Sequence, residues 1–171
     1  MLKYTLFLFV IATGLRAAGQ NIAELERRNG FKDLKLGMHL DSVKGEKKFK
    51  KDFLEQGEFN ARLYTVEYPD YGKIGEIPVL RVEIETYKDQ VYHIKVITVK
   101  DSRLMKALES TYGLAEYDLK RETYFWKGET LILKFRSASR NQLEMAFTSY
   151  PILAMMKADK GKKVEDIADD F

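Results

Sequence analysis

Alternation of apolar and polar residues is the clearest pattern in this chain, and it is strongest between residues 78 and 100. On one side of the alternation stand apolar or small residues: Leu80, Val82, Ile84, Thr86, Tyr92, Ile94, Val96 and Thr98. A period of two, bounded by turn residues, is typical of half-buried strands. The pattern therefore predicts a central β-hairpin that buries this set, closed by a three-residue turn at Tyr87, Lys88 and Asp89.

The same criteria predict further elements on both sides of the hairpin. Strands are expected at residues 61–68, 121–127, 129–136 and 142–150, the last two with apolar positions on one face: Leu131, Leu133, Phe135, Leu143, Met145 and Phe147. Helices are expected at 21–28 (a short lead-in helix or else a loose arm), 42–54, 102–112 and 151–158. Phe49 and Phe53 lie one helical turn apart in the second of these, and Gly113 would end the third.

This order predicts an α+β protein with an antiparallel sheet and its helices packed on one face. A repeated order of elements indicates two α-β-β-β units, at residues 20–100 and 101–160, followed by a flexible tail at 161–171. The strands of the two units either merge in one antiparallel sheet or lie side by side. The same offset along the chain relates Asp41-Ser42 to Asp101-Ser102 and Tyr64 to Tyr124.

The beginning of the chain, residues 1–19, has the features of a secretory signal peptide. Lys3 precedes an apolar run from Tyr4 to Leu15, and small residues follow Arg16. A membrane anchor is the alternative, but a spanning helix needs roughly 20 apolar residues. We therefore expect cleavage between Gly19 and Gln20, no membrane span afterwards, and a periplasmic or secreted protein.

Charge and composition narrow the function further. The chain has 29 basic and 26 acidic residues, and loss of Lys3 and Arg16 with the leader leaves 27 and 26, so nucleic acid is not an expected partner. The absence of cysteine excludes disulfides and thiolate catalysis. Lysines on one side of the predicted 42–54 helix form either a solvated face or a surface for an anionic partner.

No arrangement of residues indicates catalysis, a metal site or a cofactor. The two histidines, His39 and His93, lie far apart in the chain and on different elements. Glu83 and Glu85 point to the same side of one strand, where cross-strand pairing with Lys95 accounts for them. We therefore expect a protein that is not an enzyme, although a hydrolase with a site assembled from distant residues stays an alternative.

Aromatic residues are the most informative class for binding. Tyr64, Tyr68, Tyr71, Tyr124 and Trp126 form a candidate interaction surface, because Tyr and Trp are common at protein interfaces. The alternative places Trp126 in the core. The expected function is a non-enzymatic interaction module whose partner is another envelope or extracellular protein. A small-molecule or lipid carrier, with its ligand between sheet and helices, is the second possibility.

One short motif suggests a family. The run from Gly37-Met38 to Val43 resembles the helix-opening signature of the BamE or SmpA-like outer-membrane assembly lipoproteins. Tandem units of this kind also look like the fold of the β-lactamase inhibitor protein. His39 replaces the family's hydroxyl residue, and the chain has no cysteine to lipidate. The resemblance implies a fold and a tendency to bind proteins.

Overall fold

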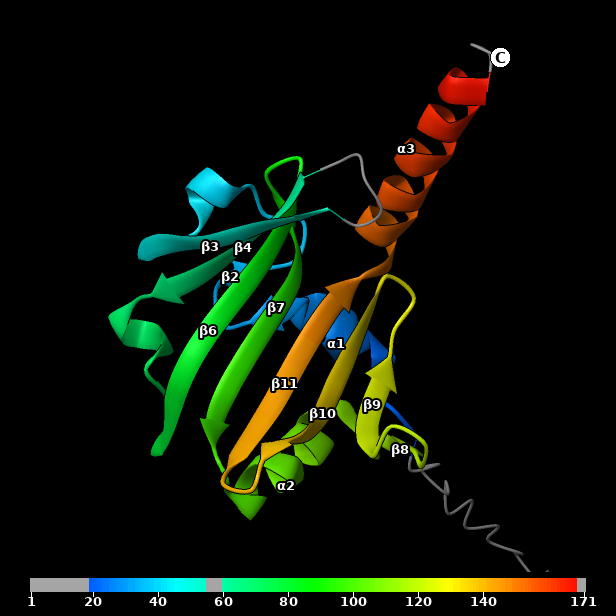
Figure 1. Ribbon diagram of the computed structural model, residues 1–171. Helices are drawn as coiled ribbons and strands as arrows, with labels where there is room; N and C mark the ends of the chain where they lie inside the picture. Colours follow the sequence, from blue (N-terminus) through cyan, green and yellow to red (C-terminus); the bar gives the residue numbers. More distant parts are fainter. Residues whose placement is uncertain (1–18, 55–59, 169–171) are drawn as a thin grey trace, which may run out of the picture.

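The computed structural model describes residues 19–54 and 60–168, and its main feature is a nine-stranded antiparallel sheet (Figure 1). In spatial order the strands are β3 (Glu46–Leu54), β4 (Asn60–Glu67), β6 (Ile77–Tyr87), β7 (Gln90–Val99), β11 (Gln142–Ser149), β10 (Leu131–Ser139), β9 (Thr123–Lys127) and β8 (Glu116–Asp118). The short β5 (Lys73–Ile74) pairs with β6. The expected α+β class with an antiparallel sheet is confirmed, whereas residues 1–18 of the predicted leader lie outside the described residues.

Apart from β5, the sheet consists of two four-stranded meanders. Strands β3, β4, β6 and β7 form the first, β8 to β11 form the second, and they meet where β7 pairs antiparallel with β11. A helix precedes each meander: α1 (Ile22–Arg28) and α2 (Ser102–Tyr112). Between α1 and β3 lies a small hairpin of β1 (Gly30–Phe31) and β2 (Leu34–Lys35).

Helices α1 and α2 cover one face of the sheet, behind it in Figure 1. Apolar side chains from both meanders form a single buried layer on this covered face: Val82, Ile84, Ile94, Val96, Leu131, Leu133, Phe135, Leu143, Met145 and Phe147. The alternation of these residues predicted their burial, and the prediction is confirmed. Burial of apolar surface at about 25 cal/mol per Å² makes this layer the main source of stability.

Two irregularities in the central hairpin correct the prediction. The turn has two residues, Lys88 and Asp89, both with positive φ (49° and 58°), since Tyr87 pairs directly with Gln90. Register shifts near both ends of the hairpin then change which face some residues occupy. Leu80 is consequently 50% exposed, and Tyr92 packs on the face opposite Ile94.

The predicted helix at residues 42–54 is wrong, because Glu46–Leu54 form strand β3 at the edge of the sheet. Phe49 pairs across to Tyr64 on β4, and a bulge follows it. The motif beginning at Gly37 opens only a 3-10 helix at Leu40–Ser42, capped by the His39 imidazole, which accepts from the Asp41 amide. Met38 and Val43 pack into the core on either side of that turn.

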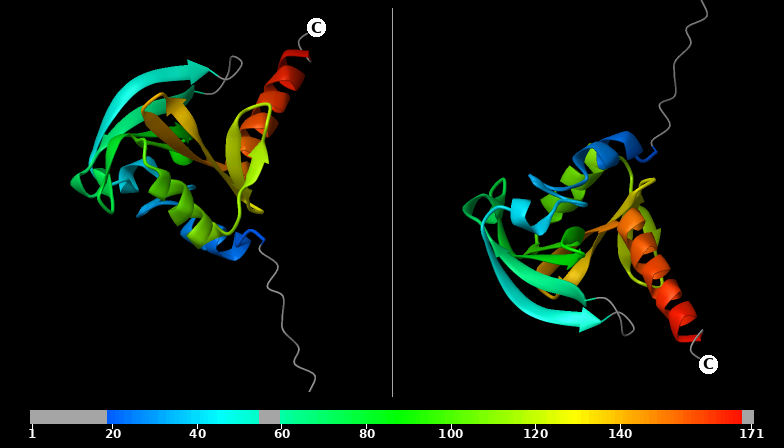
Figure 2. Two further views of the ribbon diagram at one scale, coloured as in Figure 1. Left: turned by 90° about the horizontal axis from the view of Figure 1, so that it is seen from below. Right: turned by 90° about the horizontal axis from the view of Figure 1, so that it is seen from above.

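Helix α3 (Tyr150–Ala168) corrects the expectation that the helices share one face. It lies on the side of the sheet away from α1 and α2, and β3 and β4 curve toward the same side (Figure 2). Ile152 and Met156 pack there against Ala61, Tyr87 and Tyr92. The helix also continues well beyond the expected end at residue 158. Within residues 19–54 and 60–168, no helix has the length and apolar character required to cross a bilayer.

Helix α2 is positioned by its two ends. The Asp101 carboxylate accepts the Arg103 amide at 2.8 Å, which caps the first turn as the sequence predicts. Gly113 ends the helix with φ of 79°, and a side chain there would clash with the backbone of residues 19 and 20. The Trp126 indole donates to the Gly113 carbonyl at 2.8 Å, so the helix terminus and β9 are fixed together.

Candidate functional site

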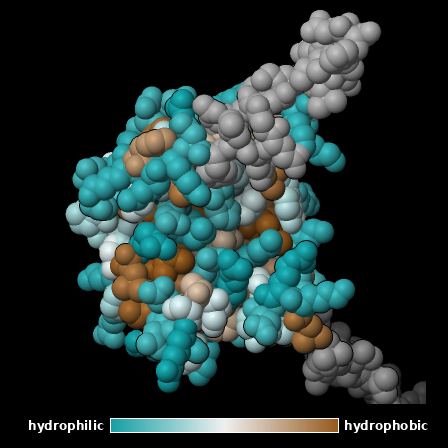
Figure 3. Space-filling model, viewed as in Figure 1, coloured by the Kyte–Doolittle hydropathy of each residue, from teal (hydrophilic) through white to brown (hydrophobic). Residues whose placement is uncertain are grey.

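Among residues 19–54 and 60–168, only the first turns of α3 cover the face of the sheet opposite α1 and α2, and they do so at one corner; we call this face the open face. Seen from this side, the surface over β6, β7, β11 and β10 is mainly hydrophilic, with separate hydrophobic patches (Figure 3). A groove of about 650 Å³ crosses it. The lining residues come from β7, β11, β10, β9, the end of β8 and the turn after it: His93, Lys95, Asp118, Arg121, Thr123, Phe125, Ile132, Lys134, Arg136, Glu144, Ala146 and Thr148.

Strand register explains how these residues meet. Lys95 pairs with Ala146, Ala146 with Lys134, and Lys134 with Phe125, so four strands contribute one row of neighbouring side chains. Side chains of residues paired across antiparallel strands lie on the same face. The methyl group of Ala146 is the smallest in the row and stands between two lysines. Two long cations therefore flank a short residue in the middle of this row.

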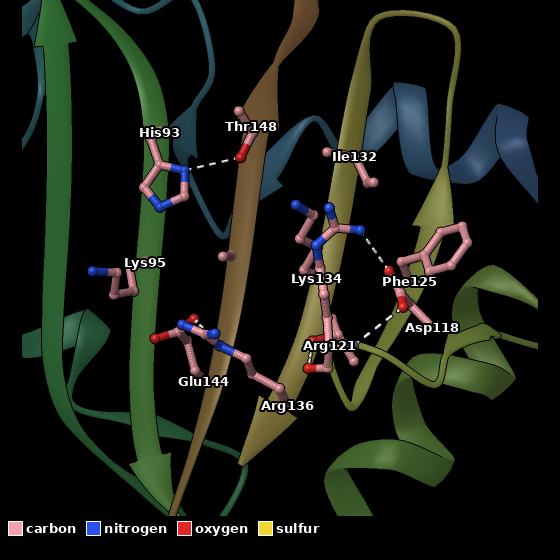
Figure 4. Close-up of a pocket in the computed structure, with 12 residues that line it drawn as sticks. His93, Lys95, Asp118, Arg121, Phe125, Ile132, Lys134, Arg136, Glu144 and Thr148 are labelled. Atoms are coloured by element: carbon pink, nitrogen blue, oxygen red, sulfur yellow. Dashed lines mark hydrogen bonds and ion pairs between the residues drawn. The ribbon is translucent and has the colours of Figure 1, made fainter. Parts of the chain in front are cut away.

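The groove carries an excess of positive charge. Its cations are Lys95, Arg121, Lys134 and Arg136, and its carboxylates are Asp118 and Glu144. Arg136 contacts Glu144 and Arg121 contacts Asp118, at 2.8 and 2.7 Å (Figure 4). The hydrogen bond from Arg121 lowers the pKa of Asp118 below its ordinary value, so this carboxylate stays ionised.

The two lysines differ in their partners. Lys95 reaches Glu83 at 3.3 Å, the cross-strand pairing that the sequence predicts. Lys134 is exposed and makes no hydrogen bond or ion pair with any residue in 19–54 or 60–168. An ammonium group without a carboxylate partner is available to an anion from outside. The charge of the groove is therefore suited to carboxylates or phosphates, and Lys134 is its cation without a carboxylate partner among the described residues.

His93 forms the neutral end of the groove. Its Nδ1 lies 2.9 Å from the Thr148 hydroxyl on the neighbouring strand, and Figure 4 shows the ring turned toward that residue. Burial lowers the pKa of His93 below its ordinary value, so the imidazole is uncharged at neutral pH. Within the described residues no three His, Asp or Glu side chains are gathered as a metal ion would require.

Two tyrosines lie at the β8 end of the sheet, on the face that carries Phe135, since Tyr124 pairs with Phe135 and with Tyr117. The rings of Tyr117 and Tyr124 lie 4.6 Å apart, and the residues are 45% and 39% exposed. Nearby in the chain, Leu119 is 81% exposed. A further hollow of about 460 Å³ lies beside these tyrosines and shares Arg121 and Arg136 with the groove. The exposed aromatic pair is therefore close to the end of the groove but lies on the opposite side of the sheet.

The aromatic residues chosen from the sequence do not form one surface. Tyr64, Tyr71 and Trp126 are buried in the core, and Tyr68 is half-buried beside Tyr71 with ring centroids 5.1 Å apart. Tyr124 alone of the five is exposed, on β9 near the other end of the sheet.

The glycines and the glutamine singled out in the sequence are not among the residues that line the groove. Gly37 donates its amide to the Val91 carbonyl at 2.7 Å, which ties the motif to the start of β7. Gly19 is exposed, at the boundary of the described residues. The Gln20 side chain accepts the Lys127 amide and donates to the Phe125 carbonyl, so the expected first residue of the mature chain is fixed against β9.

Sequence reasoning did not find the basic groove. Its cations are scattered along the chain from Lys95 to Arg136, and no local motif contains them. Alternation along the sequence does place Lys134 and Arg136 on the face opposite the core residues of β10, so the sequence alone indicates two exposed cations on this strand. The missing information was strand order, because only the β7–β11 and β11–β10 pairings bring Lys95 beside Lys134.

Comparisons with known proteins add no further constraint to this geometry. Searches of the chain against protein-family models, curated proteins and solved structures gave no match. The function must therefore be inferred from the groove and its surroundings.

Proposed function

We propose that the protein is a non-enzymatic binding module, exported from the cytoplasm, that holds an acidic segment of another protein on its open face. The observation that carries this proposal is the basic groove, with four cations against two carboxylates and Lys134 unpaired among the described residues. Carboxylates of a partner would form charge-assisted hydrogen bonds with these groups. Complementary charge of this kind directs both encounter and register.

The shape of the site favours a protein segment over a compact ligand. The groove crosses β7, β11, β10 and β9, and at the β8 edge of the sheet the exposed Tyr117 and Tyr124 lie on the adjoining face, within reach of a segment that passes around this edge. Exposed tyrosines supply large contact areas at interfaces with little loss of conformational entropy. Strand β8 is a three-residue edge that pairs with β9 alone among the described strands, so its other side can receive an extended segment.

Export and duplication belong to the same proposal. The predicted leader at residues 1–19 supports a partner in the envelope or outside the cell. A helix followed by a four-stranded meander occurs twice, and this repeated order supports descent from a duplicated unit, with four strands in each half where the sequence predicted three. It is also compatible with the predicted resemblance to tandem BamE-like or β-lactamase-inhibitor-like units.

Site-specific photo-crosslinking tests the proposed surface. Benzoylphenylalanine replaces Lys134 in one form of the mature protein and Lys106 in a matched form, since Lys106 is exposed on α2 on the opposite side. We expect position 134 to crosslink a defined envelope protein through a segment rich in Asp and Glu. Crosslinks from position 106 alone, or to a segment without acidic residues, would contradict the proposal.

A charge reversal then measures the contribution of the groove. With the crosslinked acidic segment as a labelled peptide, Lys134→Glu should weaken binding at least tenfold in fluorescence anisotropy, because one attraction becomes a repulsion. Lys106→Glu changes the net charge equally and should leave the affinity within twofold. Equal losses in both variants would mean that only overall charge matters, and the groove would then not be the site.

A further inference from the structure

A second pocket lies on the covered side of the molecule and is independent of the basic groove. It has a volume of about 450 Å³ and is bounded by α1, the β1–β2 hairpin and α2. Its floor is apolar and comes from the core: Phe31, Leu104, Met145 and Phe147 are each buried. Pockets of roughly 300–1,000 Å³ with apolar walls are typical small-molecule sites.

The pocket exists because the helices cover the sheet incompletely. Helix α1 has only seven residues, and Gly30, which follows it, presents no side chain to the space. On α2 the small residue Ala107 lines the pocket and is itself exposed. An opening therefore leads from the surface to Met145 and Phe147 on β11.

The lining of this pocket includes four cations and no acidic residue. They are Arg27 and Arg28 at the end of α1, and Lys32 and Lys35 in the hairpin. Both arginines contact Glu24, which lies outside the lining. An apolar floor beneath a wholly basic set of charged groups is complementary to a ligand with one anionic end and one hydrocarbon end.

The lysines are held by neutral groups. Lys35 donates to the Arg28 carbonyl at 2.7 Å and Lys32 to the Lys73 carbonyl at 2.8 Å, and neither forms an ion pair with a carboxylate among the described residues. Burial, reinforced by the charges of Arg28 and Arg27, lowers the pKa of Lys35, although Asp33 opposes the shift. An anion close to Lys35 would supply the counter-charge that the surrounding residues do not.

We propose that this pocket binds a free fatty acid, with its acyl chain on the apolar floor and its carboxylate held by Lys35 and Arg28. The volume fits one chain, which favours a fatty acid over a two-chain phospholipid. This inference goes beyond the binding of a protein segment and uses none of the residues of the basic groove.

The test titrates the full mature protein with saturated fatty acids of eight to twelve carbons, below their micelle concentrations, by isothermal calorimetry. Affinity should rise about fourfold for each added methylene, as expected when each CH₂ leaves water. Dodecanoate should bind at least tenfold more tightly than dodecanol or dodecyltrimethylammonium. Chain-length-independent binding, equal affinity for the three head groups, or no binding would each overturn the proposal.

Tryptophan fluorescence independently tests where the fatty acid binds. Trp126 is the only tryptophan, and its ring lies 6.2 Å from that of Tyr112, which lines the pocket. Dodecanoate should therefore change the emission of Trp126 with the same dissociation constant as the heat signal. Calorimetric binding without any change in this emission would place the ligand elsewhere and contradict the assignment.

Two variants distinguish the contribution of the ligand's acyl chain to binding from that of its carboxylate. Ala107→Trp places a large ring in the opening from an exposed helical position and should reduce dodecanoate affinity at least tenfold. It adds a second tryptophan, so calorimetry is used for it. Arg28→Gln should weaken dodecanoate binding without affecting dodecanol, and Lys106→Gln serves as the control on α2.

The proposal would be contradicted if Ala107→Trp bound dodecanoate with wild-type affinity. It would also be contradicted if Arg28→Gln weakened the binding of dodecanoate and of dodecanol equally. The same variants should bind the acidic peptide of the open face normally. Failure of one proposal therefore leaves the other intact.

Discussion

The two faces of the sheet differ although the same strands build both of them. Along β10, Leu131, Leu133 and Phe135 enter the buried layer, while Ile132 and Lys134 line the basic groove. The first set is enclosed beneath α1 and α2, and the second stays accessible because α3 covers only a corner. Along one strand, alternate residues thus contribute to stability on the covered face, and the residues between them contribute to the proposed binding site on the open face.

The largest expected effect comes from adjacent residues of β10. Leu133→Ala should lower the free energy of unfolding by about 2–5 kcal/mol, because Leu133 is fully buried and the substitution leaves a cavity. Ile132→Ala, on the open face, should cost about 1 kcal/mol or less, since Ile132 is only half-buried. Urea denaturation measures both values, and equal losses would show that the two faces contribute alike.

A smaller effect, of opposite sign, is expected at Thr98 on β7. Its hydroxyl is fully buried and has no hydrogen-bond partner among the described residues. Thr98→Val removes this unsatisfied group at nearly constant shape, and should raise the free energy of unfolding by about 1 kcal/mol. Thr148→Val on the open face is the matched control, because its hydroxyl contacts His93 and its loss should give no gain. A gain at position 148 and none at 98 would reverse the expected roles of the faces.

The smallest expected effect is a pH dependence confined to the open face. Burial holds the pKa of folded His93 below the unfolded value of about 6.5, so the unfolded chain binds more protons between these values. Stability should therefore fall as the pH drops from 7.5 to 5.0, a range that leaves the aspartates largely ionised. His93→Gln should reduce this fall, as measured by urea midpoints at the two pH values. The exposed His39→Gln is the control, and an unchanged pH dependence in His93→Gln would contradict the assignment.

Most of the regular structure was predictable where the pattern is strong. The prediction of helix α2 was correct because Asp101 caps the helix and Gly113 ends it. The predictions of β10 and β11 were correct because the alternation of apolar and polar residues in these strands is unbroken. The prediction of a helix at residues 42–54 was wrong for a physical reason. A spacing of four residues fits a helical turn and also one face of a strand, and an edge strand such as β3 has few apolar residues to distinguish them.

The candidate sites depend on information that the sequence does not contain locally. Bulges in the central hairpin move Leu80 and Tyr92 away from the face that strict alternation assigns to them. The groove requires the pairing of β7 with β11, two strands that are separated along the chain by α2 and by β8 to β10. Large aromatic residues such as Trp126 are equally suited to cores and interfaces, so residue type alone did not separate the two.

The lysine-rich edge strand β3 has a consequence for solubility. Within the described residues β3 pairs only with β4, so its outer side offers backbone amides and carbonyls along the whole strand. Lys47, Lys48, Lys50 and Lys51 make the docking of a second such edge electrostatically costly. Acetylation of these amines would remove that repulsion and should favour edge-to-edge association of folded chains through β3.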